Sequence, residues 1–157
     1  MRMISPLMAD NDRGFTLVEL LCVAGISGIL AAVGTVQAFD FIERARYRRA
    51  QLDLEAFHQE VLLHYTRRGS YPDSWQDLGY GSPPEDPWEN EYVYNNHDLV
   101  GSGEIRKDGP TIPINSYYDL FSLGPDGEWS SDLNASSSRD DVIVANNGQY
   151  IGKAADY

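Results

Sequence analysis

The chain has 157 residues, with 24 acidic and 12 basic side chains and a formal net charge of −12. Residues 69–157 hold most of the acid, with 16 acidic and 4 basic side chains. This balance argues against a nucleic-acid partner, because phosphates need a basic surface. The single cysteine, Cys22, cannot form a disulfide within the chain.

The first element in chain order is an apolar run that follows Gly14 and Phe15. No residue from Leu20 to Val36 is charged, and Glu19 is the one charge just inside the run. A helix over this stretch spans roughly 25 Å, close to the ~30 Å hydrocarbon core of a bilayer. A carboxylate at that depth costs on the order of 2–3 kcal/mol, so we expect Glu19 to have a partner.

This stretch resembles the processing motif of type IV pilins and pseudopilins. The matching residues are Gly14, Phe15, Thr16, Leu17 and Glu19. The resemblance implies that a prepilin peptidase cuts after Gly14 and methylates the new amine of Phe15. It also implies that Glu19 pairs with this amine on a neighbouring subunit during assembly. Residues 1–14 are then a leader peptide, and residues 15–39 form the transmembrane and filament-core helix.

Two observations bear on this interpretation. A secretory signal peptide fits less well, because the leader balances two basic against two acidic residues and Glu19 lies inside the apolar run. The four arginines between positions 44 and 49 favour a cytoplasmic flank by the positive-inside rule. The family places that flank outside, and we follow the motif.

Residues 40–68 show the pattern of an amphipathic helix. Apolar side chains recur every three or four positions at Tyr47, Ala50, Leu54, Phe57, Val61 and Tyr65. This face is expected to pack on a sheet, and the helix is expected to end at Arg68 with Gly69 as its C-terminal cap. His58 and His64 are expected to be solvated.

The head, residues 69–157, is predicted to be a small antiparallel sheet, so the fold class is α+β. We expect a helical turn after Asp73, strands over 92–94, 115–123 and 140–144, and a further segment at 149–152 beside the last strand. Residues 95–110 should form a polar hairpin or excursion. Tyr117, Asp119, Phe121 and Leu123 should share one side of their strand. Trp88 is expected to anchor the core against the helix.

The head is similar to the G-type major pseudopilin of type II secretion systems. The resemblance runs through Asp86-Pro87-Trp88 and Tyr118–Gly127 to Asp140-Asp141. It implies one structural calcium ion, bound by the Leu123 carbonyl, Asp126 and one or both of Asp140 and Asp141. Calcium prefers such oxygen ligands in irregular loops. Residues 128–139 are longer than the family pattern and add Glu128 and Asp132 as candidates. The alternative is a solvated acidic loop without an ion.

The resemblance implies a structural subunit rather than an enzyme. It would polymerise in the bacterial inner membrane, as a single-pass protein with a periplasmic head, into a filament that drives type II secretion. Its partners would be other copies of itself, the prepilin peptidase, minor pseudopilins and the inner-membrane assembly platform. One alternative is a type IV pilin of a surface pilus. Another is an enzyme or binding domain on an anchor, which no catalytic or zinc-type spacing supports.

Overall fold

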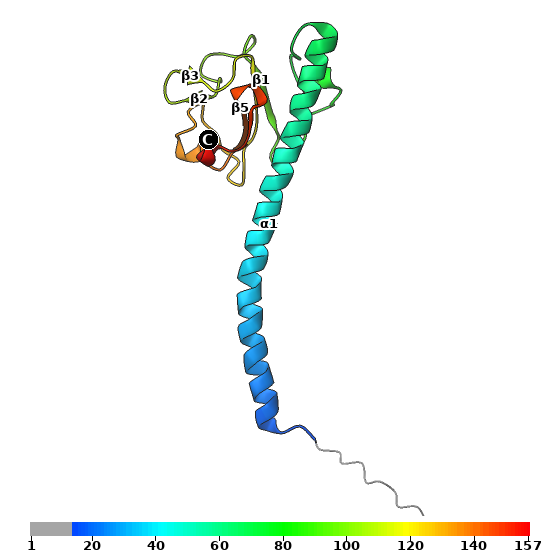
Figure 1. Cartoon of the computed structure of the whole chain (residues 1–157), viewed down its shortest axis with the longest axis vertical. Coiled ribbons are helices and arrows are strands. Elements are labelled where there is room, and N and C mark those ends of the chain that lie inside the picture. Colours follow the sequence, from blue (N-terminus) through cyan, green and yellow to red (C-terminus); the bar gives the residue numbers. More distant parts are fainter. Residues whose placement is uncertain (1–13) are drawn as a thin grey trace, which may run out of the picture. The chain divides into compact units, whose positions relative to one another are not determined.

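The computed structural model describes residues 14–157, apart from the side chains of residues 32–38. The predicted leader therefore lies outside the described residues except for Gly14. The chain divides into two compact units, one ending at Phe41 and the other comprising Ile42–Tyr157. The long helix α1, Leu17–Arg68, contributes to both (Figure 1).

The first unit contains the N-terminal part of α1. Its described apolar side chains are exposed, with Phe15, Leu17 and Ile29 each more than two thirds accessible. No helix among the described residues is long and apolar enough to cross a membrane. The expected transmembrane segment, residues 15–39, includes side chains that are not described, so it stays a prediction.

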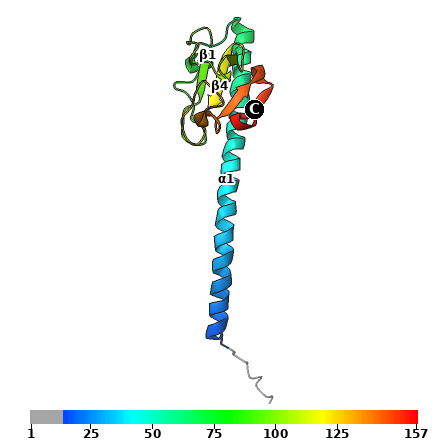
Figure 2. The ribbon, with the colours of Figure 1, turned by 90° about the vertical axis from the view of Figure 1, so that its left-hand side faces the viewer.

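The second unit contains the rest of α1 and a four-stranded antiparallel sheet. The strands are β1 (Val93–Asn96), β4 (Tyr118–Ser122), β5 (Val142–Ala145) and β6 (Tyr150–Lys153), in the order β1-β4-β5-β6. A separate ribbon pairs β2 (Lys107–Asp108) with β3 (Ile112–Pro113) in the excursion between β1 and β4, which extends beyond the predicted end at residue 110. Figure 2 shows β1 and β4 lying beside the C-terminal part of α1. The predicted α+β fold is confirmed.

One face of the sheet packs on α1. Ala50, Leu54 and Val61 are fully buried there against Tyr118 and Val144. Residues three or four positions apart share one face of a helix, and every second residue shares one face of a strand, so these side chains lie on the packed face of their element. Trp88 packs edge-on against the Tyr47 ring with 4.8 Å between ring centres, as predicted for a core anchor.

The opposite face of the sheet has a second core, formed by the alternate residues of the same strands. Phe121, Ile143 and Ala145 pack there with Ile114 from the excursion and Leu133 from the loop after β4. All five residues of β4 are therefore buried. A central strand that is covered on both faces loses the polar-out alternation of an exposed sheet.

The end of α1 is as predicted. The helix ends at Arg68, and Gly69 has φ +76° and donates its N–H to the Tyr65 carbonyl at 2.8 Å. A residue with a positive φ after the last turn favours glycine, because a Cβ atom is strained there.

The expectation that His58 is solvated is wrong. His58 is only 5% exposed, and its Nδ1 atom lies 2.7 Å from the Tyr118 hydroxyl. Helix geometry explains the burial, because position 58 lies one turn after Leu54 and three residues before Val61, on the edge of the packed face. His64 is more accessible, and its Nδ1 lies 3.0 Å from the Ser70 carbonyl.

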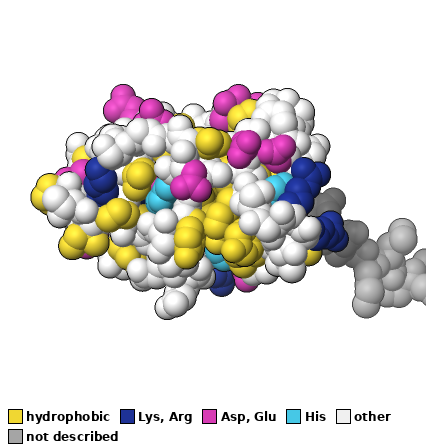
Figure 3. Space-filling view, turned by 90° about the horizontal axis from the view of Figure 1, so that it is seen from above, with side chains coloured by type: hydrophobic (Ala, Val, Ile, Leu, Met, Phe, Trp, Pro, Cys, Tyr) yellow, Lys and Arg dark blue, Asp and Glu magenta, His cyan; other side chains and the backbone are white. Residues whose placement is uncertain are grey.

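On the face seen in Figure 3, acidic side chains lie at separate positions rather than in one cluster. Figure 3 shows Asp and Glu side chains at several separate positions on one end of the molecule, with hydrophobic and basic ones between them. On α1, Arg46 and Glu43 form an exposed ion pair at 3.1 Å. Dispersed surface charge of this kind keeps a domain solvated and contributes little to its stability.

Candidate functional site

The residues of the processing motif form a capping box at the start of α1. Glu19 Oε2 accepts hydrogen bonds from the backbone N–H of Thr16 at 2.9 Å and from its hydroxyl at 2.8 Å. The Thr16 hydroxyl accepts the Glu19 N–H at 3.3 Å. This reciprocal arrangement satisfies backbone donors that a helix start leaves unpaired. The Thr-x-x-Glu spacing could have predicted it.

Among the described residues, Glu19 forms side-chain hydrogen bonds through one oxygen only. These bonds run through Oε2, and the residue is exposed. Its second oxygen, Oε1, has no hydrogen bond to a described residue. Gly14 and Phe15 directly precede this cap and are exposed, with nothing within 4 Å of a Cβ atom placed on Gly14.

The turn after β4 holds two of the predicted calcium ligands. Asp140 Oδ2 accepts the backbone N–H of Asp126 at 3.2 Å, and Asp126 Oδ1 accepts that of Glu128 at 2.8 Å. Gly124 has φ +65° and lies so close that a Cβ atom there would be 2.6 Å from the Asp140 carbonyl oxygen. Both carboxylates therefore accept backbone N–H groups of the turn after β4, Asp126 from within it and Asp140 from just before β5.

Asp141 has a different environment. Its side chain is fully buried, and its Oδ2 lies 2.7 Å from Nη2 of the fully buried Arg106. Burial raises the pKa of Asp141 to about 7, Arg106 opposes that rise, and Asp140 and Asp126 add to it. Burial also lowers the pKa of Arg106, against the attraction of Asp141. This ion pair was not predicted from the sequence.

These residues, as they lie, do not fit a calcium site. Calcium takes six to eight oxygen ligands at 2.3–2.6 Å. Among residues 14–157, no three His, Cys, Asp or Glu side chains are grouped so that they could hold a metal ion. Asp141 already contacts a cation, whereas Asp126 and Asp140 bond to backbone N–H groups. Glu128 is exposed, and Asp132 caps Asn134 in the loop that follows.

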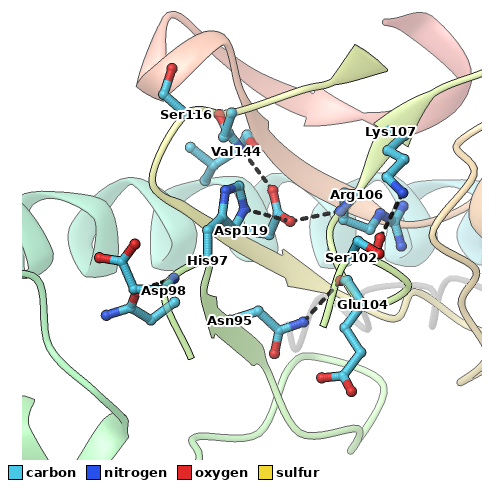
Figure 4. Close-up of polar contacts among 12 residues, drawn as sticks. Asn95, His97, Asp98, Ser102, Glu104, Arg106, Lys107, Ser116, Asp119 and Val144 are labelled. Carbon is cyan, nitrogen blue, oxygen red and sulfur yellow. Dashed lines mark hydrogen bonds and ion pairs between the residues drawn. The ribbon is translucent and has the colours of Figure 1, made fainter. Parts of the chain in front are cut away.

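A second buried aspartate, Asp119 on β4, organises the excursion that carries Arg106. Its Oδ2 accepts the backbone N–H of Arg106 at 2.7 Å and lies 3.0 Å from His97 Nε2, while Oδ1 accepts from Asn115 at 3.1 Å (Figure 4). Sequence reasoning placed Asp119 on the correct face of its strand but assigned it no role. The contact between His97 and Asp119 was not predicted from the sequence.

The fold and the helix start define a class of proteins. Pilin-like filament subunits have a long N-terminal helix that packs on a small antiparallel sheet. In this chain the helix begins within the motif Gly-Phe-Thr-Leu-x-Glu. Residues 10–35 match the family described as the prokaryotic N-terminal methylation motif. No solved structure matches this chain.

Curated relatives make the assignment more specific. The chain is 30% identical over 143 residues to type II secretion system core protein G of Escherichia coli, covering 78% of this chain and 88% of the relative. It is 31% identical over 146 residues to the core protein G of Pseudomonas aeruginosa, covering 80% and 92%. The chain belongs to the type II secretion system core protein G family.

Pilins also match, over a shorter stretch. The type IV major pilin protein PilE1 of Neisseria gonorrhoeae is 39% identical over 79 residues, which covers 50% of this chain and 48% of the pilin. The core protein G matches cover 78% and 80% of this chain, against 50% for this pilin match.

Proposed function

We propose that this chain is the structural subunit of a type II secretion pseudopilus, anchored in the inner membrane with its head in the periplasm. The observation that carries the proposal is the similarity to core protein G over most of both chains, helix and head together. The relatives are named as a core protein of a secretion system and as a major pilin protein, which favours a structural role over a catalytic one. A type IV pilin is the alternative, supported by the half-length match to PilE1.

In this proposal the helix start is the processing and assembly site. The peptidase cuts after Gly14, and Phe15 becomes the methylated N-terminus. The new amine of one subunit meets Oε1 of Glu19 on its neighbour, while Oε2 continues to cap α1. Two charges that are costly alone in a bilayer become tolerable as a pair, and the pairing sets the axial register of the filament.

The same proposal names the partners. Copies of this chain form the helical filament, and minor pseudopilins and the inner-membrane assembly platform start and support its growth. Growth of the filament would push secreted proteins outward. The calcium ion expected from the family resemblance is not part of this proposal, and the experiments on Arg106 below test for it directly.

Three variants separate the charge of Glu19 from its capping role. Glu19→Gln removes the charge but keeps an oxygen that can accept the Thr16 N–H, since glutamine also serves in a capping box. Thr16→Ala removes the hydroxyl of the cap, at a cost of about 0.5–2 kcal/mol in helix stability, and keeps the charge. Glu19→Ala removes both.

Filaments sheared from cells that carry the secretion system are the readout, with the processed mass as a control for cleavage. If the charge drives assembly, Glu19→Gln and Glu19→Ala lose filaments and Thr16→Ala keeps them. Normal filaments from correctly processed Glu19→Ala would refute the assembly role. Loss in Thr16→Ala with filaments retained in Glu19→Gln would show that capping, not charge, is what matters.

A further inference from the structure

Arg106 is a fully buried arginine in a head with a large excess of acid. Its Nη2 contacts Asp141, and its guanidinium carbon lies 4.4 Å from the centre of the Phe121 ring and 5.8 Å from that of Trp129. Its Nε and Nη1 atoms have no hydrogen-bond partner among the described residues. A buried guanidinium is stable only where an opposite charge compensates for lost hydration, so the contact with Asp141 is essential to its position.

Two parts of the head cooperate to hold Arg106 in place. On one side, its N–H donates to Asp119, and its carbonyl accepts the Ile114 N–H at 3.1 Å. On the other, the loop after β4 docks on the next residue. Lys107 donates its N–H to the Ser131 carbonyl at 2.7 Å, and Leu133 donates to the Lys107 carbonyl at 3.0 Å.

The extra length of residues 128–139 therefore has a structural use. The loop supplies Trp129 and Leu133 to the second core and covers the excursion on which Arg106 lies. The loop and the buried arginine are thus parts of one arrangement.

Asp141 requires a positive charge from some source. It is fully buried directly before β5, and a buried carboxylate is stable as an ion only where an opposite charge compensates for the lost hydration. In the family this position is expected to face calcium. Here a guanidinium contacts it at 2.7 Å.

We propose that the Arg106 guanidinium supplies, from within the chain, the positive charge at Asp141 that the family is expected to take from calcium. The cation is then a side chain of the excursion, Arg106, which contacts Asp141 at the end of the loop after β4. The head folds without a metal ion. This arrangement makes the stability of the head independent of the calcium concentration.

The first test is thermal unfolding of the full chain in detergent, in calcium and in chelator. All three tryptophans, Trp75, Trp88 and Trp129, lie in the second unit, so their fluorescence reports on the head alone. The proposal predicts the same Tm in both conditions. A calcium site filled to about 100 times its Kd would raise Tm by roughly 10 °C. A calcium-specific rise of that kind, lost in Asp126→Ala, would overturn the proposal and support the predicted ion.

The second test is a double-mutant cycle made in chelator. Arg106→Met keeps an apolar stem without the charge, and Asp141→Leu removes its partner. Each single variant should lower Tm strongly because it leaves one buried charge without its counter-ion, and the double variant should recover much of the loss. Arg139→Met, at an exposed arginine close to the same turn, is the matched control and should leave Tm unchanged.

Strictly additive losses in the cycle would overturn the proposal, since they would show that the two side chains are not coupled. If a single variant does not fold, the comparison of the unmodified chain in calcium and in chelator still decides the question. Both tests use the unassembled chain, so their outcome is independent of whether filaments form.

Discussion

The packing of α1 on the sheet can be tested with two leucines that differ in burial. Leu54 is fully buried in the core between α1 and the sheet, whereas Leu52, two residues earlier, is 58% exposed. Leu54→Ala removes three buried carbon groups, a loss of about 2.4 kcal/mol at ~0.8 kcal/mol for each. Incomplete collapse of the resulting cavity brings the expected loss into the range of roughly 2–5 kcal/mol.

For a unit the length of residues 42–157, this loss corresponds to a fall in Tm of roughly 8–20 °C. Leu52→Ala should change the free energy of unfolding by less than about 0.5 kcal/mol, because its side chain stays largely in water. Urea and thermal unfolding followed by tryptophan fluorescence measures both variants in the full chain. Equal losses for the two leucines, or a loss below about 1 kcal/mol for Leu54→Ala, would refute the packing described for this face.

Two further predictions concern a glycine and a histidine. Gly124→Ala should lower the free energy of unfolding by more than about 1 kcal/mol in a urea titration, because φ is +65° and the new Cβ atom would lie 2.6 Å from a backbone oxygen. Gly101→Ala, with nothing within 4 Å, is its control, and an equal loss would contradict the argument. Burial lowers the pKa of His58 below its ordinary value of 6.5. The unfolded chain then binds a proton more readily, so stability should fall as pH drops below about 6.5, by up to about 1.4 kcal/mol per pH unit. His58→Gln should remove this part of the slope, and an unchanged slope would refute it.

Much of the head could be predicted from periodicity. The stripe from Ala50 to Val61 has the helical period, and the two sides of β4 follow the strand period, so both buried faces were placed correctly. Gly69 marked the end of the helix because a left-handed residue is needed there. These features depend on local geometry, which the sequence records within a few residues.

His58 shows the limit of such patterns. A polar residue at the edge of an apolar stripe can point to water or be buried, and the choice depends on a partner far along the chain. Here the partner is the Tyr118 hydroxyl, 60 residues away, which bonds to the imidazole. A buried ring nitrogen is acceptable once it has such a partner, and sequence spacing on the helix carries no information about it.

Arg106 eluded prediction for a related reason. It lies in a polar, glycine-rich excursion, and local composition there indicates a solvated loop. Its burial arises from three distant contributions, namely Asp119 on β4, Asp141 before β5 and the long loop that supplies Trp129. The acidic residues near the turn predicted a bound cation, because clustered carboxylates repel one another without one. In the described residues, the cation beside Asp141 is a side chain rather than a metal ion. An acidic cluster found in a sequence should therefore be checked for a nearby arginine or lysine before a metal is assigned to it.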